Sequence, residues 1–104
     1  MDKLFIIKEL KKLLSDKFQD LDQVILYGSQ VNGKADDDSD YDVLIVLSDD
    51  FDWKRENEIL DVCYEIDLKH DILIDARITS RRDLETIIGR QPFILNALDS
   101  GVRV

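Results

Sequence analysis

The residues best suited to chemistry lie in one loop and in the strand that follows it. Residues 28–42 read GSQVNGKADDDSDYD and separate two apolar runs, VILY and VLIVL. Acidic side chains crowd the second half of this segment, and Asp40 and Asp42 run directly into the second apolar run. Crowding of like charges destabilises a fold unless a positive group sits among them. The segment therefore indicates a binding site for a cation.

Asp40 and Asp42 are expected to project from the same side of a strand. Alternate residues of a strand share a face and lie about 6.5–7 Å apart, so two carboxylates can converge on a cation between them. Mg²⁺ prefers one or two protein carboxylates and keeps its other positions for water and phosphate oxygens. Two such ions about 3.5–4 Å apart bind both the attacking and the leaving oxygen of a phosphoryl or nucleotidyl transfer. Asp75, within a later apolar strand, is the natural third carboxylate, and Asp71 on the same face is the alternative.

Gly28 and Ser29 follow the first apolar run and are suited to binding phosphate. A glycine lets a phosphate approach the backbone closely, and the free N–H groups at the start of a helical turn attract anions. We expect such a turn to run from Gly28 to Gly33, with the Ser29 hydroxyl as a further donor. One end of the site is thus suited to a polyphosphate and the other to the metal that neutralises it.

Two other metals fit the sequence less well. A calcium loop beginning at Asp36 would require Gly at its sixth position and Glu at its twelfth, where the chain has Tyr41 and Leu47. Zinc is disfavoured because the chain has one histidine and one cysteine. We expect His70 to be exposed and uninvolved, and Cys63 to be a small core residue.

Size and charge exclude several classes of protein. The 104 residues are expected to form one domain, residues 1–104. Asp and Glu number 23 against 14 Lys and Arg, and the net charge of -9 argues against nucleic-acid or anionic-membrane binding and permits a metal or a basic partner protein. A single cysteine excludes an internal disulfide and fits the cytoplasm. We find no apolar segment long enough for a signal peptide or a membrane span.

Helices and strands that must position these residues can be read from the apolar spacing. The class predicted is α+β, a small mixed sheet of about three strands flanked by helices. Ser80 with Asp83, and one of Asp49, Asp50 or Asp52, are the expected helix caps. The expected helices span residues 3–18, about 52–66, 80–88 and 92–101, and the expected strands span 23–27, 41–47 and 71–78.

The loop and its strand resemble a known signature. Gly-Ser, a glycine four residues after the serine, and Ser-Asp-any-Asp leading into an apolar strand resemble the nucleotidyltransferase superfamily that includes DNA polymerase β. In this chain the elements are Gly28-Ser29, Gly33 and Ser39-Asp40-Tyr41-Asp42. At this length the chain looks most like the minimal nucleotidyltransferases, many of which are antitoxins encoded beside a helical HEPN-domain toxin.

The resemblance implies a reaction and a division of roles. The reaction is transfer of a nucleoside monophosphate, usually AMP from ATP, and in the antitoxin members the acceptor is a tyrosine hydroxyl of the toxin. Asp75 is then best placed to help deprotonate that hydroxyl. The nucleotide site comprises Gly28, Ser29, Gly33 and Ser39, and two Mg²⁺ ions are held by Asp40, Asp42 and Asp75.

One departure from the family pattern keeps other functions open. Members often carry Ala-Arg before the loop glycine, whereas this chain has Val31-Asn32, which lacks a cation able to meet a phosphate. A non-catalytic acidic module that neutralises a basic partner by forming a complex is therefore the alternative function. A small-molecule acceptor is less favoured, because the chain is too short for a second pocket-forming domain. We also expect a second chain to complete the open site, as a partner or within an oligomer.

Overall fold

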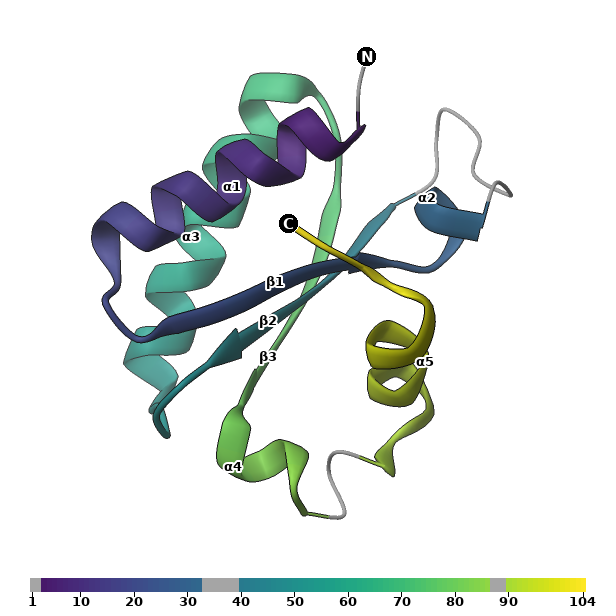
Figure 1. The fold of residues 1–104 in the computed structure, drawn as a ribbon. Coiled ribbons are helices and arrows are strands. Elements are labelled where there is room, and N and C mark those ends of the chain that lie inside the picture. Colours follow the sequence, from purple (N-terminus) through teal and green to yellow (C-terminus); the bar gives the residue numbers. More distant parts are fainter. Residues whose placement is uncertain (1–2, 33–39, 87–89) are drawn as a thin grey trace.

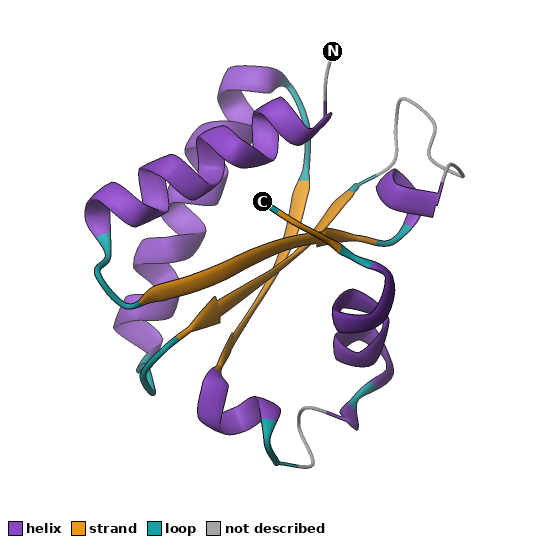
Figure 2. Ribbon diagram, in the orientation of Figure 1, coloured by secondary structure: helices purple, strands orange, loops and turns teal. Residues whose placement is uncertain are grey.

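The computed structural model describes residues 3–32, 40–86 and 90–104. Helices α1 and α3 lie on one side of a sheet, and α5 lies on the other (Figures 1 and 2). Among the helices of the described ranges, none is long and apolar enough to cross a membrane. The elements are α1 (Lys3–Lys17), β1 (Leu21–Tyr27), α2 (Ser29–Asn32), β2 (Tyr41–Leu47), α3 (Trp53–His70), β3 (Ile74–Ser80), α4 (Arg81–Leu84), α5 (Pro92–Ser100) and β4 (Val102–Arg103).

The sheet brings the ends of three strands to one place. Its strand order is β3-β2-β1-β4, with β2 antiparallel to β1 and parallel to β3. The parallel pair is joined by α3, which supplies the crossover that parallel strands need. Because of these directions, the end of β1 and the starts of β2 and β3 meet at the same end of the sheet. The glycine-serine turn and the aspartates predicted to bind metal belong to these three ends.

Both faces of the sheet are buried, which explains why β1 and β2 read as almost continuous apolar runs. The face toward α1 and α3 carries Val24, Leu26, Val43, Ile45 and Leu47, packed with helix residues such as Leu10 and Ile59. The opposite face carries Ile25, Tyr27, Leu44 and Val46, packed with Ile94 and Ala97 of α5. Since successive strand residues alternate between faces, Asp42 shares the α5 side of the sheet with Tyr27 and Leu44.

The predicted helix caps are confirmed at two positions. The Asp52 carboxylate accepts the Arg55 N–H at 3.0 Å at the start of α3. The Ser80 hydroxyl accepts the Asp83 N–H at 3.1 Å at the start of α4. Each side chain satisfies a backbone donor that has no partner within its own helix. These local interactions could be read from sequence because cap and partner lie three residues apart.

The predicted α+β class is confirmed, with corrections to its details. The sheet has four strands and not about three, because Val102 and Arg103 pair with Leu26 and Ile25. β3 begins at Ile74 and not at residue 71, and α3 continues to His70. α4 ends at Leu84 and not near residue 88, where residues 87–89 lie outside the described ranges.

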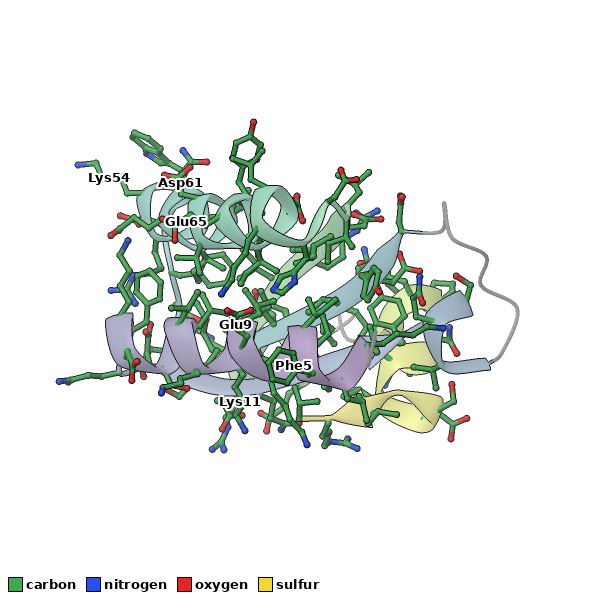
Figure 3. The ribbon with its side chains drawn as sticks, turned by 90° about the horizontal axis from the view of Figure 1, so that it is seen from above. Phe5, Glu9, Lys11, Lys54, Asp61 and Glu65 are labelled. Atoms are coloured by element: carbon green, nitrogen blue, oxygen red, sulfur yellow. The ribbon has the colours of Figure 1, made fainter. Side chains whose placement is uncertain are left out.

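The expectation that His70 is exposed and uninvolved is wrong. Its side chain is only 10% exposed, and its Nε2 lies 2.6 Å from Oε2 of Glu9. The other Glu9 oxygen accepts a bond from Lys69. The Lys69 bond first, and then that of His70, hold the pKa of Glu9 below its usual range. Glu9 thus reaches from α1 toward α3 and joins the two helices (Figure 3).

Candidate active site

Asp42 and Asp75 are direct neighbours on adjacent parallel strands. The register pairs Asp42 of β2 with Asp75 of β3, at the interstrand spacing of about 4.8 Å. Asp40 lies two residues before Asp42, outside the strand and exposed. Burial first, then the charges of Asp75 and Asp40, raises the pKa of Asp42. The three aspartates that the sequence singles out are therefore electrostatic neighbours.

Gly28 lies against the carboxylate of Asp42. Tyr27, the last residue of β1, pairs with Asp42, and Gly28 follows it with a left-handed φ of +77°. A Cβ at position 28 would lie 2.3 Å from Oδ2 of Asp42, which is closer than atoms can approach. Glycine is favoured here by its backbone angle, and a larger residue would displace the carboxylate beside it. Ser29 directly follows and opens α2, as predicted.

Two contacts position the start of β2. The side-chain amide of Gln30 lies 3.5 Å from the Asp40 carbonyl, and the Tyr41 N–H donates to the Leu73 carbonyl at 2.8 Å. The first contact joins α2 to the start of β2, and the second joins the start of β2 to the chain leading into β3. The side chains of Asp40 and Asp42 are placed by these contacts and by the strand register.

Asp71 is not the partner of Asp42. It lies outside β3 as the C-cap residue of α3, exposed, with a left-handed φ of 53°. Its backbone N–H donates to the Asp67 carbonyl, so the residue ends the helix. Asp75 has the register position opposite Asp42, four residues further on. Of the two alternatives for a third carboxylate, the strand pairing favours Asp75.

Several predicted site residues cannot be placed. Gly33 and Ser39 lie in residues 33–39, outside the described ranges, together with the acidic run before Asp40. The side chain of Asn32 is also outside the description. Their roles stay predictions from the sequence.

Sequence reasoning missed Arg77 and Tyr27. Arg77 Nε lies 3.9 Å from Oδ1 of Asp75, a loose ion pair, and its guanidinium lies 5.1 Å from the centre of the Phe93 ring. The charge of Arg77 opposes the rise in the pKa of Asp42. Burial, then the charges of Asp42 and Asp75, raises the pKa of Tyr27. Alternation along β3 by itself places Arg77 on the face of Asp75, whereas Tyr27 could be placed there only once the pairing of β1 with β2 was known.

The donor set suits a hard cation. Its side chains offer carboxylate oxygens, which Mg²⁺ prefers, and neither a thiolate nor an imidazole for zinc. Within residues 3–32, 40–86 and 90–104, no group of three or more acidic, histidine or cysteine side chains is arranged so that it could hold a metal ion. The excess of negative charge at Asp42 is what a bound cation would neutralise. By the chemistry of their oxygens, the neighbouring carboxylates of Asp42 and Asp75 suit Mg²⁺ better than zinc.

Comparison with known proteins identifies the family. A family model described as "Nucleotidyltransferase domain" matches residues 7–104. The chain belongs to this nucleotidyltransferase family. A relative from Methanocaldococcus jannaschii, named "Putative protein adenylyltransferase MJ0141", is 43% identical over 75 residues, covering 71% of this chain and 76% of the relative. The predicted superfamily and the prediction of an enzyme fold are thereby confirmed.

Solved structures share the nucleotidyltransferase fold. One is a toxin-antitoxin crystal structure with AMP-PNP, at a TM-score of 0.62 and 20% identity, covering 92% of this chain and 69% of that chain. Another is a tri-AMPylated HEPN toxin in complex with an MNT antitoxin from Shewanella oneidensis, at a TM-score of 0.59 and 17% identity. That match covers 98% of this chain and 71% of the other. At these identities the similarity establishes the fold.

Proposed function

We propose that this nucleotidyltransferase transfers AMP from ATP to a hydroxyl of a partner protein, a tyrosine of a HEPN-type toxin, and so acts as an antitoxin. The observation that carries the proposal is the pairing of Asp42 with Asp75 beside Gly28. The names of the relatives, which specify protein adenylylation and toxin-antitoxin complexes, support the acceptor class.

Each residue has a stated part in the reaction. The Gly28 backbone and Ser29 bind the triphosphate, with Gly33 and Ser39 in the same nucleotide site. Asp40, Asp42 and Asp75 would hold two Mg²⁺ ions, which would stabilise negative charge on the attacking and leaving oxygens. Cations would be needed between the aspartates and the ATP, because carboxylates and phosphates otherwise repel each other.

The chemical step balances as a displacement at the α-phosphorus. The acceptor oxygen forms a bond to the α-phosphorus, the bond to the β-phosphate oxygen breaks, and pyrophosphate leaves. Asp75 takes the proton of the acceptor hydroxyl, because it lies at the sheet edge and is half exposed, with 47% of its side chain accessible. Asp42, more enclosed between β1 and β3, has no comparable access to an incoming protein.

The test uses three aspartates of one chain. Purified protein is incubated with α-labelled ATP, Mg²⁺ and a HEPN-type toxin, and label on the toxin is measured. Asp42→Asn and Asp75→Asn are expected to lose transfer, because each removes a carboxylate of the pair. Asp71→Asn is the matched control and should transfer normally, since Asp71 is exposed and outside the strand register. Normal transfer by Asp42→Asn would refute the proposal.

A second function is favoured by the outer face of α3. Trp53, Tyr64 and Leu68 are large apolar residues with 68%, 59% and 68% of their surface exposed. They recur at helical spacing, so they form one stripe along the helix. An exposed stripe of this kind marks a surface for a protein partner.

The charges beside this stripe specify the partner. Glu58, Asp61 and Glu65 are exposed on α3, and none makes an ion pair with another described residue (Figure 3 labels Asp61 and Glu65). Lys54, whose Nζ lies 5.8 Å from the centre of the Trp53 ring, adds one positive charge at the start of the stripe. The three acids beside it still disfavour a second copy of a chain with net charge -9 and favour a basic protein. We infer that α3 can bind a basic partner whether or not transfer occurs, which is the non-catalytic alternative.

The two functions separate in one comparison. Asp42→Asn tests transfer, whereas Asp61→Lys combined with Glu65→Lys tests binding through α3, with Glu85→Lys on the end of α4 as the matched control. If the catalytic variant still neutralises the toxin in cells while the α3 variant does not, neutralisation is by complex formation. If only the catalytic variant fails, neutralisation is by transfer.

A further inference from the structure

A polar cleft lies beside the edge strand β3, and among the lining residues within the described ranges only Asp75 takes part in the proposed reaction. Its volume is about 600 Å³, within the range of roughly 300–1,000 Å³ that small-ligand sites occupy. Asp75 lies at one end of it. Its lining includes Glu56, Asp75, Arg77, Thr79, Asp83 and Phe93.

The cleft exists because α5 covers only part of its side of the sheet. Ile94 and Ala97 of α5 pack on residues of β1 and β2, such as Ile25 and Leu44. The neighbouring edge strand is left open on this side. Strand alternation directs Asp75, Arg77 and Thr79 to that open side, with successive members about 6.5–7 Å apart.

Thr79 gives the cleft an unused hydrogen-bonding group. The residue is 4% exposed, and its Oγ1 has no hydrogen-bond partner among the residues that the structure describes. A buried hydroxyl in that condition is unfavourable, because it has lost water without gaining a partner. Thr79 belongs to the row of β3 that lines the cleft, but its hydroxyl oxygen is itself buried.

Arg77 supplies the positive charge in the cleft. Its guanidinium is placed by the Phe93 ring at 5.1 Å and by the loose ion pair with Asp75 at 3.9 Å. With 57% of its side chain exposed, it can still bind an anion. The other charged residues that line the cleft within the described ranges are acidic: Glu56, Asp75 and Asp83.

The position of the cleft assigns it to the acceptor and not to the donor. Gly28 and Ser29 lie on the β1 side of Asp42, whereas the cleft lies on the β3 side, beyond Asp75. A hydroxyl that gives its proton to Asp75 therefore approaches from the cleft. This assignment rests on the proposed function.

We propose that the cleft binds the segment of the acceptor protein that carries the reacting hydroxyl, and that Arg77 selects a carboxylate two residues from it. An extended segment places alternate side chains about 6.5–7 Å apart, which matches the spacing from Asp75 to Arg77. A tyrosine at Asp75 then puts the side chain two residues away at Arg77. A carboxylate there forms a charge-assisted bond with the guanidinium.

The test measures a preference within each variant. Short tyrosine peptides carry Glu or Lys two residues before or after the tyrosine, and kcat/KM for AMP transfer is measured for each. The wild type is expected to prefer the Glu peptide of one pair by up to about fivefold in kcat/KM, as for an ion pair with a largely exposed guanidinium. The ratio of kcat/KM for the Glu peptide to kcat/KM for the Lys peptide should fall near one in Arg77→Gln. In Arg77→Glu the Lys peptide should be the preferred one. A ratio within one variant cancels any general effect on folding or on chemistry.

Arg82→Glu is the matched control. Arg82 is an arginine on α4 with 80% of its side chain exposed, paired with Asp50 and outside the cleft. It should keep the wild-type preference. A wild-type ratio near one, or an unchanged ratio in Arg77→Glu, would overturn the proposal. So would a raised KM for ATP in Arg77→Glu with the peptide ratio unchanged, because Arg77 would then belong to the donor site.

A binding measurement separates this proposal from the proposed function. The same peptides with Phe in place of the tyrosine cannot accept AMP, and their binding is followed by fluorescence anisotropy. If no peptide is ever labelled, charge-dependent binding that inverts in Arg77→Glu still supports the cleft as a peptide site. Absence of such a charge dependence overturns it.

Discussion

Replacing Gly28 by alanine tests whether the glycine and the Asp42 carboxylate share one space. The substitution should lower both the free energy of unfolding and the rate of transfer. The left-handed φ of +77° disfavours a residue with a Cβ by about 1–2 kcal/mol. The new Cβ would also lie 2.3 Å from Oδ2 of Asp42 and 3.2 Å from its Cγ. The oxygen must therefore retreat by about 1 Å, a displacement that costs on the order of 10² in rate at a reacting centre.

The two costs can be separated by a double-mutant cycle with Asp42→Ala. Truncation removes Oδ2 and Cγ and leaves only the Cβ at 3.3 Å from the new methyl group. In the Asp42→Ala background, Gly28→Ala should lower the free energy of unfolding only through the unfavourable backbone angle. The coupling energy between the two substitutions should therefore be about 1 kcal/mol, within the 0.5–3 kcal/mol found for contacting residues. Each kcal/mol corresponds to about 4–8 °C in Tm for a domain of about this size.

The assay for this cycle is urea unfolding followed by circular dichroism at 222 nm. Helix content is the better reporter because Trp53, the single tryptophan, is already 68% exposed in the folded state. Additive free energies of unfolding, with no coupling between the two substitutions, would refute the close packing of Gly28 on Asp42. Full transferase activity in Gly28→Ala would refute its importance to the site.

Three further outcomes are expected. Asp42→Asn should raise the free energy of unfolding in EDTA while abolishing transfer, because it removes a partly buried charge that Asp75 and Asp40 repel; a less stable variant would contradict this. Asp22→Asn should be slightly less stable than wild type at neutral pH, because the bond from Arg81 lowers the pKa of Asp22. That stability is present above the unfolded pKa of about 3.9 and is lost as the pH falls through the lower folded value, so the two urea midpoints should converge in acid and not in base. Burial raises the pKa of Cys63 to about 12, so its reaction with a disulfide reagent at pH 8 should be about 10³-fold slower in the folded than in the unfolded protein, and equal rates would contradict its burial.

Some of the fold was predictable from sequence because its causes are local. The run YDVLIVL gave β2 with its observed bounds, since a strand buried on both faces needs consecutive apolar residues. β4 was missed because a strand of two residues is too short to show an alternation of apolar and polar residues. Its place depends on Gly101, where a Cβ would lie 2.3 Å from the Ala97 carbonyl and 2.5 Å from Ile25 Cγ2. Contacts between distant segments of this kind have no signal in a single sequence.

The site was predictable in its residue types and less so in its geometry. Acids inside apolar strands indicated Asp42 and Asp75, because a charge there is unfavourable without a partner. The choice between Asp75 and Asp71 needed the start of β3 and the register with β2, both tertiary properties. Alternation along β3 places Arg77 on the face of Asp75, but its contact with Phe93, sixteen residues further along the chain, has no signal in the sequence.

The central claim is that Asp42 and Asp75, beside the turn at Gly28, seat divalent ions against the phosphates of a nucleotide. Its most direct test is a crystal grown with Mn²⁺ and a non-hydrolysable ATP analogue, examined by anomalous scattering. Manganese peaks between the two carboxylates, with the triphosphate on the backbone of Gly28 and Ser29, are the predicted result. A triphosphate bound elsewhere, with no manganese at Asp42 or Asp75, would contradict the claim.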